Sequence, residues 1–372
     1  MFNKIILYLK NFDWILFAAV LLLVCFGLVE IYSITLGQGA IDLFNFKKQI
    51  FFVIVGLILL FVFAFLNYHS LRSYSNYFYL LGIILLVAVL FFGQTIRGAQ
   101  SWFYLAGFGL QPIEFVKLIL ILFLARYFSS IAFKIRPIKH LAITGGGVAV
   151  LIILVLLQPD FGSASILFLL WFFMVILAGF KKKYFIAVTL ILLILMGASW
   201  AFLFEDYQKD YQKERIITFL NPSHDPLVRG YNITQTIIAI GAGGFAGRGL
   251  GFGSQSQLKF LPEAQTDFIF AVIAEELGLL GVILVLLFFT IFFHRCLASL
   301  KKIDDDFAVF FILAAVSLIF IEMFVNISMN AGLLPIIGIS LPFLSYGGSA
   351  MLSNLILVGV IESIIIRSKI NY

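Results

Sequence analysis

Long apolar runs, each about as long as a membrane is thick, recur along the whole chain and constrain its fold more than any other feature. A helix that crosses a bilayer needs about 20 mostly apolar residues. Ten runs approach that length, with approximate limits 14–36, 49–67, 76–93, 112–129, 141–158, 161–179, 183–203, 267–293, 307–331 and 340–366. The sequence therefore predicts an all-α polytopic membrane protein with about ten transmembrane helices, forming a single domain over residues 1–372.

Composition excludes the other broad classes of protein. Of the 372 residues, 62% are hydrophobic and 12% are charged, whereas an average soluble domain has roughly 25% charged residues. A soluble protein of this composition would expose large apolar patches, and intrinsic disorder requires low hydrophobicity and high charge. The net charge of +6 need not indicate a nucleic-acid partner, because membrane proteins concentrate Lys and Arg in their cytoplasmic loops. No nucleic-acid partner is expected.

The distribution of basic residues predicts the orientation of the helices. If the N-terminus is inside, the short outer loops hold only Lys47, Lys48 and Arg97, and long translocated loops count little. The inner segments then hold Lys4, Lys10, Arg72, Arg126, Lys134, Arg136, Lys139, Lys181, Lys182, Lys183, Arg295, Lys301, Lys302, Arg367 and Lys369. Both termini are therefore expected in the cytoplasm, and the long loop 204–266 between the seventh and eighth runs is expected outside.

This long outer loop contains three different kinds of segment. Residues 205–215 are mostly charged and are interpreted as a solvated helix, whereas residues 231–240 have helical spacing but are too short to span a membrane. The glycine-rich segment 241–251 fits a loose dinucleotide fingerprint, but such a fingerprint requires a preceding strand. We interpret this segment as a loop whose glycines allow close backbone approach. Binding of a phosphate by its amides stays open.

Ionisable residues inside the apolar runs point to a polar interior, because each costs a few kcal/mol unless it is paired or faces water. Glu114 and Lys117 are three residues apart and share one helix face. They are either a structural ion pair or part of a polar cavity. The further glutamates within the runs are Glu30, Glu275, Glu276 and Glu322. Transporters and membrane enzymes both contain such groups.

Two aspartates stand at the outer ends of predicted helices. Asp160 precedes the run that begins at Phe161, and capping of that helix would explain it. Asp267 stands where the outer loop meets the eighth run, and Asp is favoured at helix N-termini. An ionised carboxylate at the outer membrane surface is also what a general base acting on a lipid-linked substrate requires. Spacing alone leaves both interpretations of Asp267 open.

Four sets of motifs occur along the chain: GAQSW at 98–102 with QPIEFVK at 111–117, QPDFGSA at 158–164, FLPEAQTDFIFA at 260–271 and PFLSYGGS at 342–349. They resemble the motifs of one family, the SEDS proteins (shape, elongation, division and sporulation). The second is similar to QPDxGTA, with Ser163 in place of Thr. The third is similar to LPExHTDFIFA, with Gln265 in place of His. The motifs occur in family order and in the expected loops.

The resemblance implies a peptidoglycan glycosyltransferase of ten spans that polymerises lipid II into β-1,4 glycan strands for cell-wall elongation and rod shape. It also implies that Asp267, the aspartate of the TDF triplet, is the catalytic base. An α-linked donor that gives a β-linked product requires inversion, hence one displacement and one base. Residues 254–260 resemble the elongation-type members of the family more than the division-type members.

The leaving pyrophosphate develops negative charge, which basic groups or a divalent cation (Mg²⁺ or Mn²⁺) would stabilise. The predicted substrate-binding residues are Arg97, Trp102, Glu114, Lys117, Asp160, Arg215, Arg248, Lys259 and Ser345. For each of them, an ordinary structural role remains the competing interpretation. No nucleotide or redox cofactor is expected.

The resemblance further implies two kinds of protein partner: a class B penicillin-binding protein that cross-links the nascent strand, and other membrane proteins of the elongation machinery. The expected location is the bacterial cytoplasmic membrane, with the active site on the extracytoplasmic face. Three alternatives remain: a lipid II flippase whose buried acids line a translocation path, a division-type polymerase, and a non-enzymatic scaffold. The flippase explains the buried carboxylates but not the extended outer loop that carries Asp267.

Overall fold

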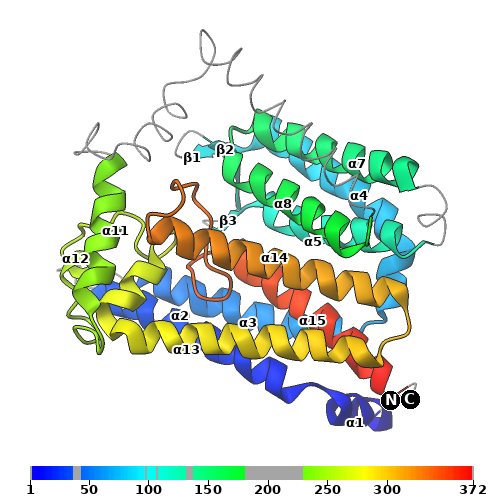
Figure 1. Ribbon diagram of the computed structural model, residues 1–372, viewed down its shortest axis with the longest axis horizontal. Coiled ribbons are helices and arrows are strands. Elements are labelled where there is room, and N and C mark those ends of the chain that lie inside the picture. Colours follow the sequence, from blue (N-terminus) through cyan, green and yellow to red (C-terminus); the bar gives the residue numbers. More distant parts are fainter. Residues whose placement is uncertain are drawn as a thin grey trace.

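The computed structural model describes residues 2–36, 43–96, 99–105, 108–130, 137–180 and 229–370. Nine of the predicted runs form helices that lie side by side along the long axis (Figure 1). They are α2 (Trp14–Leu36), α3 (Phe44–Phe65), α4 (Tyr68–Phe92), α5 (Pro112–Phe128), α7 (Pro137–Leu157), α8 (Phe161–Leu177), α13 (Ile269–Ser299), α14 (Asp306–Asn330) and α15 (Gly348–Ile370). The predicted run 183–203 and the charged stretch 205–215 lie outside the described residues.

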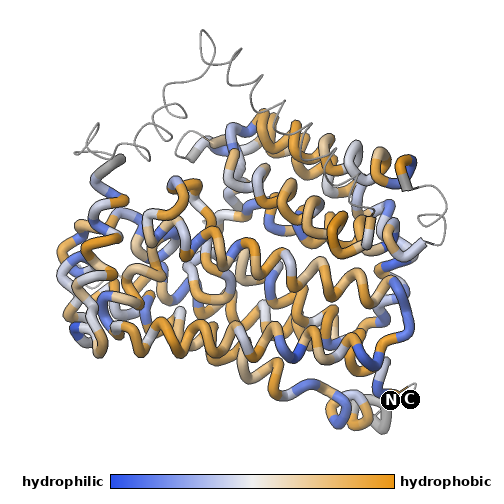
Figure 2. Tube along the Cα trace, in the orientation of Figure 1, coloured by the Kyte–Doolittle hydropathy of each residue, from blue (hydrophilic) through white to orange (hydrophobic). Residues whose placement is uncertain are grey.

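The helices have the length and composition of membrane spans, which confirms the predicted fold class. Seven described helices are long and apolar enough to cross a membrane, while α5 and α8 have 17 residues each. Hydrophobic residues dominate along the helices and hydrophilic ones gather near their ends (Figure 2). The ends of the last run differ from the prediction, because residues 340–347 form a loop and the helix begins only at Gly348.

The two ends of the bundle carry different additional elements. A short helix, α1 (Phe2–Asn11), lies beside the C-terminal end of α15, where Lys369 Nζ donates a hydrogen bond to the Asn11 carbonyl at 2.8 Å. At the opposite end α11 (Arg229–Gly243) stands across the bundle, as Figure 1 shows, and α12 (Ser254–Gln257) follows it in the chain. The predicted short helix at 231–240 is therefore confirmed as part of α11.

A small sheet at the same end as α11 was not anticipated from the sequence. It is antiparallel, in the order β1-β2-β3, and consists of β1 (Gln94–Ile96), β2 (Ala99–Leu105) and β3 (Phe108–Leu110). Strands of three to seven residues in one loop carry little periodic signal beside the long apolar runs. The sheet connects α4 to α5 and carries Trp102 on its central strand.

The glycine-rich segment packs against a break in α13, which confirms close backbone approach. Gly278 interrupts α13 with φ 65°, and the freed amides of Leu279 and Leu280 donate to the carbonyls of Gly244 and Phe245 at 3.0 and 3.2 Å. A Cβ at Gly243 would lie 1.8 Å from the Ala274 carbonyl oxygen. Helix α11, rather than a strand, precedes this segment, so the dinucleotide fingerprint is not met.

Close helix packing around α15 yields a testable expectation. A Cβ at Gly359 of α15 would lie 2.5 Å from the Leu60 carbonyl oxygen of α3, a backbone atom that cannot move aside cheaply. We expect Gly359→Ala to lower the free energy of unfolding by roughly 1–3 kcal/mol, as overpacking does, measured by denaturation in detergent.

The matched control for this substitution is Gly146→Ala in α7, where a Cβ would meet nothing within 4 Å. Alanine is the better helix former, so this variant should keep or slightly raise stability. Equal losses of stability in both variants would contradict the packing explanation.

Candidate active site

A large cavity opens at the end of the bundle that carries α11 and the small sheet. Its volume is about 1480 Å³, and both polar and apolar residues line it. The lining comes from helix ends and from loops that are far apart in the sequence: the sheet, the turn between α7 and α8, the segment 259–267 and the segment 335–350. A cavity of this size exceeds most small-molecule sites and suits a large amphiphilic ligand.

The cavity brings together six of the ten residues predicted from sequence. Asp267, Trp102, Glu114, Lys117, Asp160 and Lys259 all line it. Arg97 and Arg215 lie outside the described residues. Arg248 lies on the exposed surface and outside the lining, where its Nη1 donates to Ser254 Oγ at 2.9 Å. Ser345 is buried behind the lining.

Lys117 is held between two carboxylates at the edge of the cavity. Its Nζ lies 2.8 Å from Glu114 Oε2 and 2.5 Å from Glu322 Oε1 on α14. The three side chains are at most 10% exposed, and Glu114 and Lys117 line the cavity. The two interpretations left open by the sequence are therefore compatible, because one cluster is both a buried ion pair and part of the cavity wall.

The segment that carries Asp267 is fixed by side chains from α14. The Asp267 carbonyl accepts hydrogen bonds from Asn326 Nδ2 at 3.0 Å and from Asn330 Nδ2 at 2.9 Å. Both asparagines are fully buried. Sequence reasoning did not select these residues, although two asparagines one helical turn apart in an apolar run are a visible signal.

The loop before α15 holds the same segment from another side. Ser345 Oγ donates to the Thr266 carbonyl at 2.6 Å, and the Tyr346 amide donates to the Gln265 carbonyl at 2.8 Å. Gln265, the residue that departs from the family motif, accepts a hydrogen bond from Asn45 Nδ2 through its side-chain oxygen at 3.1 Å. Ser345 thus positions the Asp267 segment instead of forming the cavity wall.

Asp267 lines the cavity and does not occupy the N-cap position of α13. Helix α13 begins at Ile269 with Phe268 in the N-cap position, whereas the cavity lining includes Asp267. A Cβ at Gly338 would lie 3.6 Å from Asp267 Oδ2, so the backbone of the 335–340 loop approaches the carboxylate. By contrast Asp160 does cap α8, since it accepts hydrogen bonds from the Ser163 amide at 3.0 Å and from Ser163 Oγ at 2.7 Å.

Two buried glutamates of α13 anchor the chain that leads to Lys259. Glu275 accepts hydrogen bonds from the amides of Gln255 and Ser256 at 2.8 and 3.1 Å. Glu276 accepts from the Gly251 amide at 3.0 Å and from Gln257 Nε2 at 3.1 Å, and also from a serine hydroxyl of α2. Apart from Ser33 of α2, their partners lie within residues 251–257, so these acids fix that segment onto the bundle.

Neutral polar groups complete the cavity wall. Tyr346 and Tyr104 both line it. Burial raises the pKa of Tyr346, and the proximity of Tyr104 raises it further, so the hydroxyl stays protonated at neutral pH and can donate a hydrogen bond. Among the described residues no group of three or more His, Cys, Asp or Glu side chains could hold a metal ion on its own.

The fold and the cavity define the class of protein: a polytopic helical membrane protein with a carboxylate-bearing cavity at one end of its bundle. The family model of the FtsW, RodA and SpoVE proteins, described as "Cell cycle protein", matches residues 13–370. The chain belongs to this family, which confirms the resemblance to the SEDS proteins.

Individual relatives cover nearly the whole chain. "Peptidoglycan glycosyltransferase MrdB" of Escherichia coli K12 is 34% identical over 328 residues, 87% of this chain and 86% of the relative. "Probable peptidoglycan glycosyltransferase FtsW" of Trichlorobacter lovleyi is 36% identical over 370 residues, which cover 96% of this chain and 93% of the relative. A solved chain from "Structural coordination of polymerization and crosslinking by a peptidoglycan synthase complex" is 28% identical, with a TM-score of 0.80 over 97% of this chain and 98% of that one.

The Lys117 cluster predicts a large effect on stability. Lys117→Met leaves the carboxylates of Glu114 and Glu322 buried without their cation, so the free energy of unfolding should fall by about 3–5 kcal/mol. Denaturation in detergent measures this change. Adding Glu114→Gln and Glu322→Gln should restore part of the loss, because it removes the unpaired charges.

The matched control is the ion pair between Arg72 and Asp305. Arg72 Nη1 lies 3.2 Å from Asp305 Oδ1, and the two side chains are 42% and 23% exposed. Arg72→Met should cost about 1 kcal/mol or less, because solvent screens an exposed pair. If Lys117→Met costs no more than this control, burial of the cluster does not determine its strength.

Proposed function

We propose that this chain is a peptidoglycan glycosyltransferase that polymerises lipid II, the undecaprenyl-pyrophosphate-linked disaccharide-pentapeptide, into glycan strands. The observation that carries the proposal is the placement of Asp267: it lines a cavity of about 1480 Å³ at the end of a membrane bundle, and its backbone carbonyl accepts hydrogen bonds from two asparagines of α14. The names of the relatives support the reaction class.

Asp267 acts as the general base in this proposal. It takes the proton from the 4-hydroxyl of the acceptor's GlcNAc, and the oxygen attacks the anomeric carbon of the donor's MurNAc. The bond between that carbon and the pyrophosphate oxygen breaks as the new glycosidic bond forms, so the configuration inverts in one displacement. Rigid placement of the carboxylate contributes because small errors of position cost catalytic rate.

The leaving pyrophosphate requires positive charge. Lys259 and Lys117 line the cavity. Lys259 is exposed, whereas Lys117 is buried between two carboxylates. We assign to Lys259 the binding of the pyrophosphate. We assign to Lys117 the neutralisation of the buried carboxylates of Glu114 and Glu322 in the cavity wall. Trp102 offers an apolar face for a sugar ring or an isoprenoid chain.

A divalent cation, Mg²⁺ or Mn²⁺, fits this cavity as a ligand shared with the substrate. Asp160 and Glu263 line the cavity, but the described residues form no three-ligand metal site. Magnesium commonly takes one or two carboxylates together with substrate phosphate oxygens. Such an ion would neutralise charge on the pyrophosphate.

Within the family we assign the chain to the elongation-type, RodA-like members on the strength of residues 254–260. The expected partners are a class B penicillin-binding protein that cross-links the strand and other membrane proteins of the elongation machinery. The expected location is the bacterial cytoplasmic membrane with the cavity on the extracytoplasmic face. The basic residues at the opposite end of the bundle support this orientation.

The central test uses the purified chain with its class B penicillin-binding protein, lipid II and a divalent cation, and measures glycan polymer. Asp267→Asn should reduce the rate by about 10²–10⁴-fold, the range for loss of a general base. The control is the same exchange at the far end of the bundle, Asp304→Asn, on an exposed aspartate, which should leave the rate unchanged.

Two outcomes would contradict the proposal. Equal polymer from wild type and a folded Asp267→Asn variant would remove the base assignment. Absence of polymer together with passage of labelled lipid II across liposomes would establish the flippase alternative. The hydrogen bonds that Glu275 and Glu276 make to one outer loop argue against a path lined by these acids.

The asparagine clamp predicts a separate kinetic effect. Asn330→Leu removes one of the two donors to the Asp267 carbonyl, so the carboxylate is held less rigidly. We expect kcat to fall roughly tenfold to a hundredfold with little change in KM. The matched control is Asn354→Leu, another buried asparagine, on α15 and outside the cavity lining. Equal losses in both variants would indicate a general effect of removing a buried amide.

A further inference from the structure

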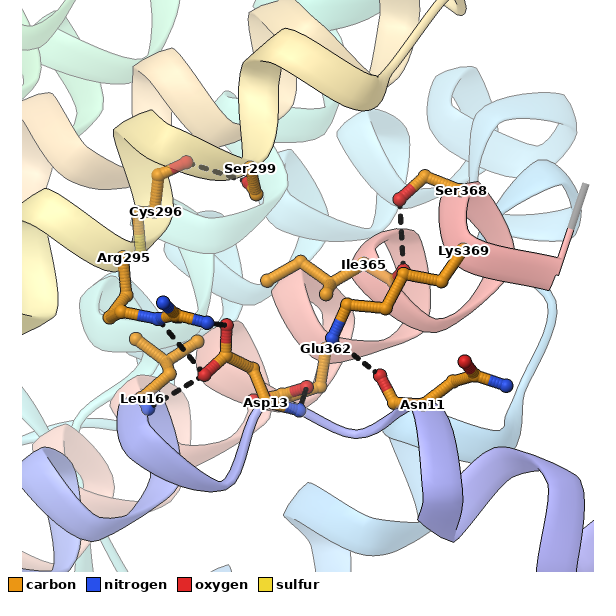
Figure 3. A network of polar contacts seen from close by, with 10 residues as sticks. All are labelled: Asn11, Asp13, Leu16, Arg295, Cys296, Ser299, Glu362, Ile365, Ser368 and Lys369. Carbon is orange, nitrogen blue, oxygen red and sulfur yellow. Dashed lines mark hydrogen bonds and ion pairs between the residues drawn. The ribbon is translucent and has the colours of Figure 1, made fainter. Parts of the chain in front are cut away.

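A second, smaller pocket lies at the end of the bundle opposite the large cavity. Its volume is about 160 Å³, and three basic side chains, two serines and one aspartate contribute to its lining: Arg295, Lys302, Lys369, Ser299, Ser368 and Asp13. They come from the C-terminal ends of α13 and α15, the turn that follows α13 and the junction between α1 and α2 (Figure 3). The proposed reaction uses none of these groups.

The frame of this pocket is rigid because its one carboxylate is saturated with hydrogen bonds. Arg295 Nε lies 3.1 Å from Asp13 Oδ1, and Arg295 Nη2 lies 2.6 Å from Asp13 Oδ2. The Leu16 amide also donates to Asp13 Oδ1 at 3.1 Å, and the Asp13 amide donates to Glu362 Oε2 at 3.0 Å. Asp13 is 4% exposed, so it orients Arg295 and does not itself offer a binding site.

Donor groups remain after these internal bonds are counted. Arg295 uses Nε and Nη2 on Asp13, which leaves Nη1. Lys369 Nζ gives one of its three hydrogens to the Asn11 carbonyl at 2.8 Å. Lys302 is exposed. The lining therefore presents three cations against one carboxylate, and the hydrogen bonds to described residues leave hydrogens on each cation for an anion.

The serine hydroxyls are already committed. Ser299 Oγ donates to the Cys296 carbonyl at 2.7 Å, and Ser368 Oγ donates to the Ile365 carbonyl at 2.9 Å. The ligand must therefore be bound by the basic groups. An anion with several oxygens suits them, because guanidinium and ammonium groups pair strongly with phosphate.

Neighbouring residues place the pocket at the depth of lipid headgroups. Trp14 follows Asp13, is 51% exposed and donates through Nε1 to the Leu9 carbonyl at 3.1 Å; Ile15 is 55% exposed. Tryptophans gather at the membrane–water interface, and the chain passes there from α1 into the apolar helix α2. In the orientation given by the basic residues this is the cytoplasmic leaflet, whose surface is rich in anionic lipids.

We propose that this pocket binds the phosphate group of an anionic phospholipid from the cytoplasmic leaflet, held by Arg295, Lys302 and Lys369. The volume admits a phosphate and its adjoining ester groups, and the rest of a headgroup would extend beyond the pocket. Basic pockets between membrane helices on this side are known to hold such headgroups. The bound lipid would connect α13 to α15, the buried helix whose other end, at Gly348 and Ser349, lines the large cavity.

The test measures lipid binding by native mass spectrometry on the purified full chain titrated with phosphatidylglycerol or phosphatidylcholine. Wild type should retain one phosphatidylglycerol in preference to phosphatidylcholine. Lys302→Gln should weaken the binding of phosphatidylglycerol about fivefold, the effect of one basic residue near a lipid surface. Lys301→Gln is the matched control, because Lys301 is an exposed neighbour outside the pocket lining, and it should bind as wild type does.

Three results would overturn the proposal. Equal retention of the two lipids would show that the headgroup charge is not recognised. Equal losses in Lys302→Gln and Lys301→Gln would indicate diffuse attraction to the surface and no defined site. Displacement of the bound phosphatidylglycerol by millimolar inorganic phosphate would assign the pocket to a soluble phosphate. Because Lys302 is exposed, its substitution should not disturb folding, and glycan synthesis in detergent can be followed separately.

Discussion

The absence of water inside a membrane is the constraint on which the rest of the structure depends. Each buried polar group must find its partners within the chain. Lys117 is held between two carboxylates, Glu275 and Glu276 bind an outer loop, and Asp13 binds Arg295. Some of these partners are far apart in the sequence, as Glu322 is from Lys117 and Arg295 from Asp13, whereas Glu114 lies on the same helix as Lys117. The need for partners therefore fastens loops and helix ends onto the bundle at both of its ends.

The same constraint explains how a carboxylate can be placed for chemistry. Asp267 lies on a non-helical segment, whose free backbone groups need donors and acceptors. Asn326 and Asn330 donate to its carbonyl, and Ser345 donates to the carbonyl of Thr266. The backbone requirement is thus met by side chains of α14 and of the loop before α15, at a residue that lines the cavity.

The sequence predicted the helical fold well because hydrophobic runs and proline breaks are local signals. The break between α7 and α8 and the short helix within α11 were both expected from the residues concerned. The β1–β3 sheet was missed because its strands are too short for a periodic signal. The predicted start of the last helix lies eight residues too early, because the segment 340–347 is apolar enough to resemble part of a span. In the structure this segment is a loop that donates hydrogen bonds to the carbonyls of Gln265 and Thr266.

Sequence by itself determined the class of membrane protein, the approximate positions of the described spans, the expected orientation and the motifs that place the chain in its family. These properties depend on hydropathy, charge and residue order, each of which can be read locally. Only the tertiary structure decided the roles of the charged residues: Asp160 caps a helix, Arg248 lies on the surface, and Asp267 lines the cavity. The physical reason is that a charge acquires its role from the groups packed around it, and the fold decides whether those groups are near in sequence, as Ser163 is to Asp160, or on another helix, as Glu322 is to Lys117.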